Sequence, residues 1–479
     1  MPKSVDDRHQ YQNQRGVPAG PATLEGLHTE LKSAILHFSA DFNSLKTLIY
    51  ASPSFYYVYT GVRKSVLSTV MLREIHPDVI PDALAVHESS EMDRQGPDQV
   101  NNTLARYKTD RHPKPAKLLP VPLSIELLAF HKKYIEFFAK DFISSILSVH
   151  PISRKPETIY RPLSSAETRR IHRSFYRFEL YCILFKQRET QDGVIQDRER
   201  LGSQAQSDMF LSLYPPWEVE ELCCVHDYIY RRLSAPFDEV AQHDVEMGEL
   251  GLNSRICGKI PIAPIVPNSL NLLMLKFTFG SGEGFDDEYK EHYLSLGLTF
   301  LHKILNKSKY EEWREMILDN IYTDYDFLVQ ALEKYYPCPD FADIADEDAD
   351  MEFRGDDGSG PNEAWLWSNE YTNSYYVNDD SKANLRKWGY CMWDSQRLSA
   401  WGLFRKPYDW AYFNARDDAL RAELKRRYEE ALRTEELRSN VWLKGGSGYW
   451  TEDESEIVWD DRQRRSGRVH PLLAGGNHA

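Results

Sequence analysis

The sequence predicts a mainly α-helical protein with a non-repetitive, multi-helix body. In residues 163–185, Ile171, Phe175 and Phe178 recur at intervals of four and three residues, which places them on one face of a helix. Few segments alternate between apolar and polar residues in the way that half-buried strands do. No segment repeats at the periods that mark helical repeat arrays. These three observations together favour an irregular helical fold.

Length and composition set the broad class. At 479 residues the chain exceeds what one core usually covers, so we expect two or three lobes. Apolar residues make up 42% of the chain and aromatic residues 13%, which is ample material for cores. The net charge of −15 argues against binding to nucleic-acid phosphates and to anionic membranes. We therefore expect neither nucleic acid nor a membrane among the partners.

Cysteine usage and the N-terminus indicate a cytoplasmic or nuclear protein. Residues 1–22 are polar and lack the apolar stretch of a signal peptide, and we expect them to be disordered. No run approaches the roughly 20 apolar residues that span a bilayer. The cysteines show no repeating spacing, which suits reduced thiols better than a disulfide framework.

Residues 24–72 predict three short helices that are too small to bury themselves. Asp41 is a good cap for the second helix, Leu45 begins its apolar stripe, and Pro53 opens the third. The first helix carries apolar residues at three- and four-residue intervals, namely Leu24, Leu27, Leu31 and Ile35. So small a unit needs a partner surface, either from the rest of the chain or from another protein.

The spacing of these residues resembles the F-box, the three-helix module that docks substrate receptors onto the adaptor of cullin-RING ubiquitin ligases. The chain departs from the family at His28, where the family has Pro, and no Trp follows in the third helix. The positions that match the family are Leu27, Glu30, Ile35, Leu36, Asp41, Leu45 and Phe55. The resemblance implies that an adaptor contacts Leu24, Leu27, Leu31, Ile35, Leu36 and Leu45.

A second resemblance covers later parts of the chain. Residues 163–185, 210–229 and 385–404 are similar to a large group of filamentous-fungal proteins that often carry such an N-terminal segment. This second resemblance implies no activity.

Composition shifts predict the order of segments along the chain. Residues 76–122 include a polar, Pro-bearing stretch that favours an extended connector. Ser164 followed by Glu167 predicts a capping box at the start of a core helix. The predicted segments are 1–22 disordered, 23–75 F-box-like, 76–122 connector, 123–339 helical core, 340–362 acidic linker, 363–443 aromatic-rich helical lobe and 444–479 flexible tail.

Catalytic and metal-binding motifs are missing from the sequence, so we expect no bond chemistry, no cofactor and no metal. Asp346, Asp348 and Asp350 have the spacing of a calcium loop's first ligands, but Met351 stands where that loop needs Gly. A solvated acidic linker is therefore favoured. His226 lies on the apolar face of its predicted helix, where a core histidine bonded to a neighbour is favoured over a metal ligand.

Two clusters are candidates for partner binding. Arg170, Arg173 and Arg177 share one side of a helix and predict a solvated face paired with Glu167 or Glu179; the alternative is a patch for an acidic partner. The aromatic-rich lobe predicts a core, with an exposed remainder that recruits a protein client. Its candidate client-binding residues are Trp365, Trp367, Trp388, Trp393, Trp401, Arg386 and Arg397.

The leading interpretation is an F-box-like interaction protein, a substrate receptor of a cullin-RING ubiquitin ligase that holds an unknown client and does no chemistry itself. Two alternatives stay open. In the first, the N-terminal helices cap the chain's own core and the protein is a helical scaffold. In the second, it is an enzyme whose catalytic residues form no recognisable motif.

Overall fold

The computed structural model describes residues 23–91, 97–111, 119–153, 155–156, 161–186, 201–248, 284–320, 327–336, 360–369, 377–409 and 433–459. The chain divides into two compact units. Unit 1 holds residues 1–76 and 115–129, and unit 2 holds residues 77–114 and 130–479. The predicted mainly α-helical, non-repetitive body is confirmed. The predicted disordered segment 1–22 and most of the acidic linker lie outside the described residues.

Unit 1 is built from helices whose starts follow local capping chemistry. Its elements are η1 (Leu24–Gly26), α1 (Thr29–His37), α2 (Phe42–Ala51), α3 (Pro53–Glu74) and all but the last residue of α6 (Val121–Phe130). Asp41 caps α2, because its Oδ1 accepts from the backbone N–H of Ser44 at 2.7 Å. Ser52 caps α3 in the same way, and Pro53 occupies the first turn of that helix.

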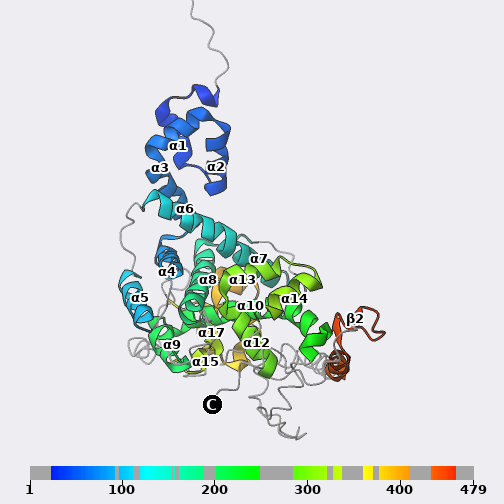
Figure 1. The fold of residues 1–479 in the computed structure, drawn as a ribbon. Coiled ribbons are helices and arrows are strands. Elements are labelled where there is room, and N and C mark those ends of the chain that lie inside the picture. Colours follow the sequence, from blue (N-terminus) through cyan, green and yellow to red (C-terminus); the bar gives the residue numbers. More distant parts are fainter. Residues whose placement is uncertain are drawn as a thin grey trace, which may run out of the picture. The chain divides into compact units, whose positions relative to one another are not determined.

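Helices α1 and α2 both pack against α3 (Figure 1). Leu36, Leu45 and Phe55 are buried, with exposed fractions of 0% to 1%. His37 Nε2 lies 2.9 Å from the Ser65 hydroxyl, which ties α1 to α3. These helices therefore bury part of their apolar surface within unit 1, while Leu31 and Phe38 stay exposed. Helix α3 extends over 22 residues, so it is long enough to back both of the shorter helices.

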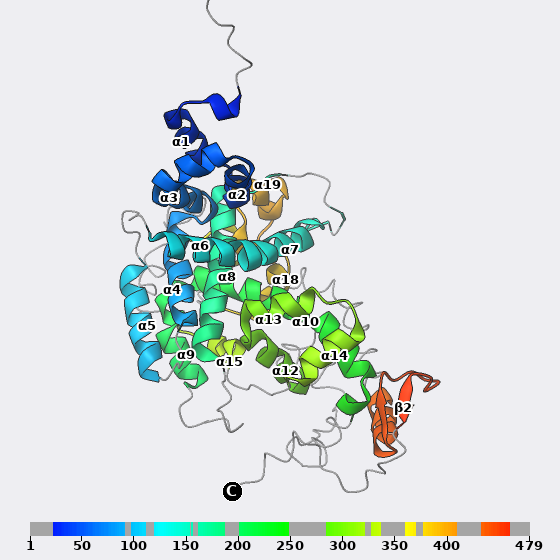
Figure 2. The same cartoon turned by 45° about the horizontal axis from the view of Figure 1, so that its top comes forward.

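Unit 2 is a helical body with α8 and α10 at its centre (Figures 1 and 2). Its longer helices are α4 (Ile80–Ser90), α5 (Pro97–Asp110), α7 (Glu136–Leu147), α8 (Ser165–Phe185), α9 (Ser203–Met209), α10 (Pro216–His243), α12 (Gly284–Ser295), α13 (Gly297–Leu305), α14 (Tyr310–Leu318), α15 (Leu328–Glu333), α17 (Glu363–Asn369) and α19 (Ser395–Ala400). The short α18 (Ala383–Arg386) and η9 (Tyr390–Met392) also touch α10. The other described short elements are η2 (Pro77–Val79), the π-helical η3 (His131–Ile135), η5 (Leu211–Leu213), η8 (Asp380–Lys382) and η10 (Leu403–Arg405).

The start of α8 is confirmed as a capping box. The Ser164 hydroxyl accepts from the backbone N–H of Glu167 at 3.0 Å, and a Glu167 carboxylate oxygen accepts from the backbone N–H of Ser164 at 3.1 Å. Most side chains of α8 are buried, because α4, α7, α10, α12 and α13 surround it. Among the described helices, none has both the length and the apolar composition that a membrane span requires.

The predicted connector 76–122 contains two helices that the sequence analysis missed. Helix α4 packs against α8, and α5 packs against α4. Val100, Leu104 and Tyr107 of α5 are buried and lie at intervals of four and three residues. This apolar row is the physical reason for the correction, because it buries one face of a segment that is polar on average.

Part of the predicted flexible tail forms an antiparallel hairpin. Strand β1 (Gly446–Gly448) pairs with β2 (Ile457–Trp459), with Ser447 opposite Val458. The hairpin contributes to a small apolar cluster that joins it to the helix at residues 433–443 and to the chain after α10. The members of that cluster are Val245, Val441, Trp442, Trp450 and Ile457. Residues 460–479 lie outside the described residues.

Candidate functional site

Helix α1 exposes a row of apolar side chains. Leu31, Ile35 and Phe38 lie at intervals of four and three residues, so they follow one line along the helix and its C-terminal cap. Leu31 is 52% exposed, Phe38 is 78% exposed, and Ile35 is half-buried. Leu24, in the preceding turn η1, is 62% exposed. We refer to these four residues as the α1 stripe.

The opposite face of α1 is fixed to the rest of unit 1. Leu36 is fully buried, and the Lys32 ammonium donates to the Glu25 carbonyl at 2.8 Å. The Arg73 guanidinium donates to the Ser39 carbonyl at 2.8 Å, just beyond the C-terminal end of α1. The α1 stripe is therefore presented by a helix that is held in place on its other side.

The residues predicted to face an adaptor divide into two groups. Leu36 and Leu45 are 0% and 1% exposed, so a partner cannot reach them and they belong to the core of unit 1. The half-buried or exposed members are Leu24, Leu27, Leu31 and Ile35. Sequence reasoning missed Phe38, although its position seven residues after Leu31 was the available signal.

The tryptophans predicted to bind a client lie largely inside unit 2. Trp393 is fully buried, Trp388 and Trp367 are buried, and Trp365 and Trp401 are half-buried. The Trp401 ring packs edge-on against Trp388 and Trp393, with centroids 6.0 and 6.2 Å apart. The predicted core is confirmed for Trp367, Trp388 and Trp393, and these three rings cannot form a recruiting surface because they are buried in the lobe.

The two arginines predicted at the rim of that surface are buried as well. Arg386 Nε donates to Asp227 Oδ2 at 2.8 Å, which joins α18 to α10. Arg397 forms a bidentate pair with Glu167, with both N–O distances at 2.8 Å. These arginines connect the lobe to α10 and to the start of α8.

The arginine row of α8 is buried, and the predicted solvated face is wrong. Arg170, Arg173 and Arg177 are between 1% and 7% exposed. Each pairs with a carboxylate from another part of unit 2: Arg170 with Asp394 at 2.7 Å, Arg173 with Glu221 at 2.6 Å and Arg177 with Glu218 at 2.7 Å. The Glu179 carboxylate, a predicted partner of the row, accepts from the backbone N–H of Leu298 instead.

These ion pairs keep the buried carboxylate of Glu218 charged. Burial alone would raise the pKa of Glu218, but Arg173 and Arg177 outweigh it and lower this pKa to about 2. Burial also raises the pKa of Asp82, and Arg177 opposes this rise. The Asp82 carboxylate accepts a hydrogen bond from the Tyr107 hydroxyl. The row is a structural ladder that joins α8 to α10, α4 and the aromatic-rich lobe.

His226 is a core histidine bonded to its neighbours, as predicted. Its Nε2 lies 2.7 Å from Glu291 Oε1, and its Nδ1 lies 3.3 Å from Asp227 Oδ1. Burial would lower its pKa, but Glu291 and Asp227 raise it to about 10. The imidazole is therefore charged near neutral pH, which does not suit a general base.

The described cysteines are buried free thiols. They are Cys182, Cys223, Cys224 and Cys391. Burial raises the pKa of each of these thiols. A reactive cysteine needs a lowered pKa and access to solvent, so these four are suited to packing. Cys257 and Cys338 lie outside the described residues.

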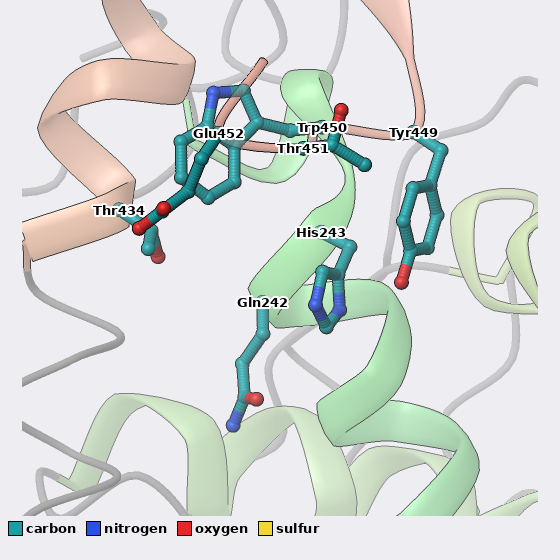
Figure 3. Close-up of a pocket in the computed structure, with 7 residues that line it drawn as sticks. All are labelled: Gln242, His243, Thr434, Tyr449, Trp450, Thr451 and Glu452. Atoms are coloured by element: carbon teal, nitrogen blue, oxygen red, sulfur yellow. The ribbon is translucent and has the colours of Figure 1, made fainter. Parts of the chain in front are cut away.

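A pocket of about 310 Å³ lies at the C-terminal end of α10, next to the hairpin (Figure 3). The rings of His243 and Tyr449 stack there, with centroids 4.8 Å apart and planes 4° apart. The Tyr449 hydroxyl donates to Glu239 at 3.0 Å, and burial together with Glu239 raises the pKa of this phenol to about 12. The Thr451 hydroxyl donates to Asp453 at 2.7 Å. These groups support the local structure, and the sequence carries no motif that points to this pocket.

Comparisons with known protein families, with curated proteins and with solved structures find no match to this chain.

Proposed function

We propose that this chain is an interaction protein that attaches to the adaptor of a cullin-RING ubiquitin ligase through the α1 stripe. The single observation that supports this proposal is the exposed apolar row on a helix whose other face is buried. Leu31, Ile35 and Phe38 have the spacing with which a helix inserts apolar anchors into a partner's groove. Clustered apolar side chains on a surface are a common mark of protein–protein contact.

The proposed mechanism is proximity and involves no bond chemistry. Unit 1 attaches to the ligase while unit 2 holds a protein client, which raises the effective concentration of the client near the ubiquitin-loading machinery. The buried ion pairs of α8 support this division, because they make unit 2 a well-connected body. The client's contacts fall on the surface of unit 2, outside the buried tryptophans.

Co-expression with the fungal cullin-ligase adaptor, followed by size-exclusion chromatography, tests the proposal. We expect the wild-type chain to co-elute with the adaptor, and Leu31→Asp and Phe38→Asp each to abolish co-elution. Thr47→Asp is the matched control, because Thr47 is an exposed residue of α2 outside the α1 stripe. Circular dichroism of all variants checks that their helices are intact.

The same experiment distinguishes the scaffold alternative. If the wild-type chain elutes alone and Leu31→Asp is insoluble, the α1 stripe packs against the chain itself and the proposal fails. If the chain elutes alone while every variant stays folded, adaptor attachment is excluded. That result does not favour the scaffold alternative. Leu36→Asp is not informative, because Leu36 is fully buried and its change disrupts unit 1 in either case.

A further inference from the structure

A second surface of unit 1 is basic and rich in tyrosine. Residues 42–73 contain no Asp or Glu, although the chain as a whole has a net charge of −15. The same residues carry the cations Lys46, Arg63, Lys64 and Arg73 and the tyrosines Tyr50, Tyr56, Tyr57 and Tyr59. A local excess of cations without carboxylates in an acidic chain calls for a physical explanation.

The structure brings part of this set together from two helices. The Lys46 ammonium lies 5.8 Å from the centroid of the Tyr50 ring near the end of α2. Tyr56, Tyr59 and Arg63 lie at intervals of three and four residues, which places them on one face of α3. Burial, Tyr50 and Tyr56 raise the pKa of the Tyr59 phenol while Arg63 lowers it, as expected for groups that lie close together.

This surface is exposed, and the face of α3 behind it is buried. Tyr50, Tyr56 and Tyr57 are 77%, 54% and 80% exposed. Lys46, Arg63 and Lys64 are exposed too. On the inner face of the same half of α3, Phe55 and Val58 are buried. We define the tyrosine surface as Lys46, Tyr50, Tyr56, Tyr59 and Arg63.

We propose that the tyrosine surface binds an acidic polypeptide segment of a partner protein. Carboxylates of that segment pair with Lys46 and Arg63, and its apolar side chains rest on the tyrosine rings between them. Tyrosine and arginine are over-represented at the energetic centres of protein interfaces, and tyrosine gives large contact area at low entropic cost. The proposal goes beyond adaptor attachment and does not rest on it, because no residue of the α1 stripe takes part.

Charge complementarity favours a polypeptide over a nucleic acid. A nucleic acid extends beyond a small patch, so it meets the repulsion of a chain whose net charge is −15. Base stacking needs open ring faces, whereas Lys46 lies over the ring of Tyr50. A short acidic segment meets only the local cations and tolerates a ring that is partly covered.

Fluorescence anisotropy with the full chain tests this proposal. The probe is a fluorescein-labelled peptide of sequence EEDFEDLEED, compared with its uncharged counterpart QQNFQNLQQN. We expect the acidic peptide to bind at least tenfold more tightly than the uncharged one, and its affinity to fall as salt increases. Lys46→Glu combined with Arg63→Glu should weaken binding at least fivefold. Tyr50→Ala combined with Tyr56→Ala should also weaken it, although the net charge is unchanged.

The matched control is Lys303→Glu combined with Lys309→Glu, which changes the net charge by the same amount at exposed sites of unit 2. This control should bind the acidic peptide nearly as well as the wild-type chain. Equal weakening in both charge-reversal variants would overturn the proposal, because attraction would then be unspecific. Tighter binding of a twelve-nucleotide single-stranded DNA, or no peptide binding at 500 μM, would overturn it as well.

Adaptor co-elution of the Lys46→Glu, Arg63→Glu variant separates the two proposals. Retained co-elution with lost peptide binding supports both proposals. A wild-type chain that binds the peptide but no adaptor supports the tyrosine surface and contradicts the ligase attachment.

Discussion

Helices α1 and α8 each carry a row of like side chains on one face, and each row lies in an unusual environment. On α1 the row is apolar and largely exposed, whereas on α8 it is cationic and buried. The two rows are Leu31, Ile35 and Phe38 on α1 and Arg170, Arg173 and Arg177 on α8. The difference shows that periodicity identifies residues that share a face, while the neighbouring elements decide what covers that face.

The neighbours of the two helices explain the difference. Helix α8 lies among several helices, and α4 and α10 bring carboxylates to its arginines. Within unit 1, α1 packs against α3, and Leu31 and Phe38 on its other side stay exposed. An arginine row can be buried only where opposite charges arrive with it.

The largest expected effect comes from breaking the buried row. We expect Arg173→Leu to destabilise unit 2 by about 3–5 kcal/mol, because Glu221 and Glu218 lose a buried partner. Urea denaturation followed by circular dichroism measures the change. Arg106→Leu is the control, because Arg106 is exposed and should shift stability by less than about 0.5 kcal/mol. A loss below about 1 kcal/mol for Arg173→Leu would contradict a structural role for the row.

The next effect concerns the inner face of α1. We expect Leu36→Ala to destabilise unit 1 by about 2–4 kcal/mol, because it leaves a cavity where a fully buried side chain stood. Thermal unfolding monitored by circular dichroism gives the change in midpoint. A shift as small as that of an exposed leucine would show that Leu36 is not in a packed core.

A smaller effect is the pH dependence that His226 introduces. Its pKa in the folded protein is raised to about 10, so its contribution is complete below the unfolded pKa near 6.5 and is lost as the pH rises toward 10. We expect stability to fall by about 2 kcal/mol between pH 7 and pH 9. The His226→Gln variant should be less stable at pH 7 and flatter across this range. An unchanged slope in that variant would assign the dependence to other groups.

The smallest effect is expected on the outer face of α1. Leu31→Ala should change the stability of unit 1 by less than about 0.5 kcal/mol, because the side chain is 52% exposed. Thermal unfolding beside Leu36→Ala measures both faces of one helix under the same conditions. A loss comparable to that of Leu36→Ala would mean that the α1 stripe is covered, which removes the basis for a docking surface.

Features encoded locally were predictable from the sequence. Ser164 and Glu167 form a capping box with side chains three residues apart, so no distant part of the chain is needed to recognise it. His226 was predictable for the same reason, because its position on the apolar face of a helix indicated a buried, hydrogen-bonded imidazole. The helical class follows from many such local signals acting together.

Features that depend on distant residues were not predictable. The partner of Arg170 is Asp394, more than two hundred residues away, so local charge patterns suggested a solvated face instead. The degree of burial of Trp393 and Trp401 was not predictable either, because composition reveals many aromatic rings without showing which of them face inward. In α5 the apolar row containing Val100 and Leu104 was present, but the polar residues around it dominated the average.

The distances that the α8 ladder covers along the chain have a consequence for biosynthesis. Helix α8 leaves the ribosome well before residues 394–397, which supply the partner of Arg170 and the arginine that binds Glu167. Until residues 394–397 have been synthesised, Arg170 and Glu167 lack these partners and are more stable in water. The partly synthesised unit 2 therefore cannot close around the start of α8. A product that terminates before residue 394 is therefore an incomplete body with uncompensated charge at its centre, and quality-control proteases should remove it.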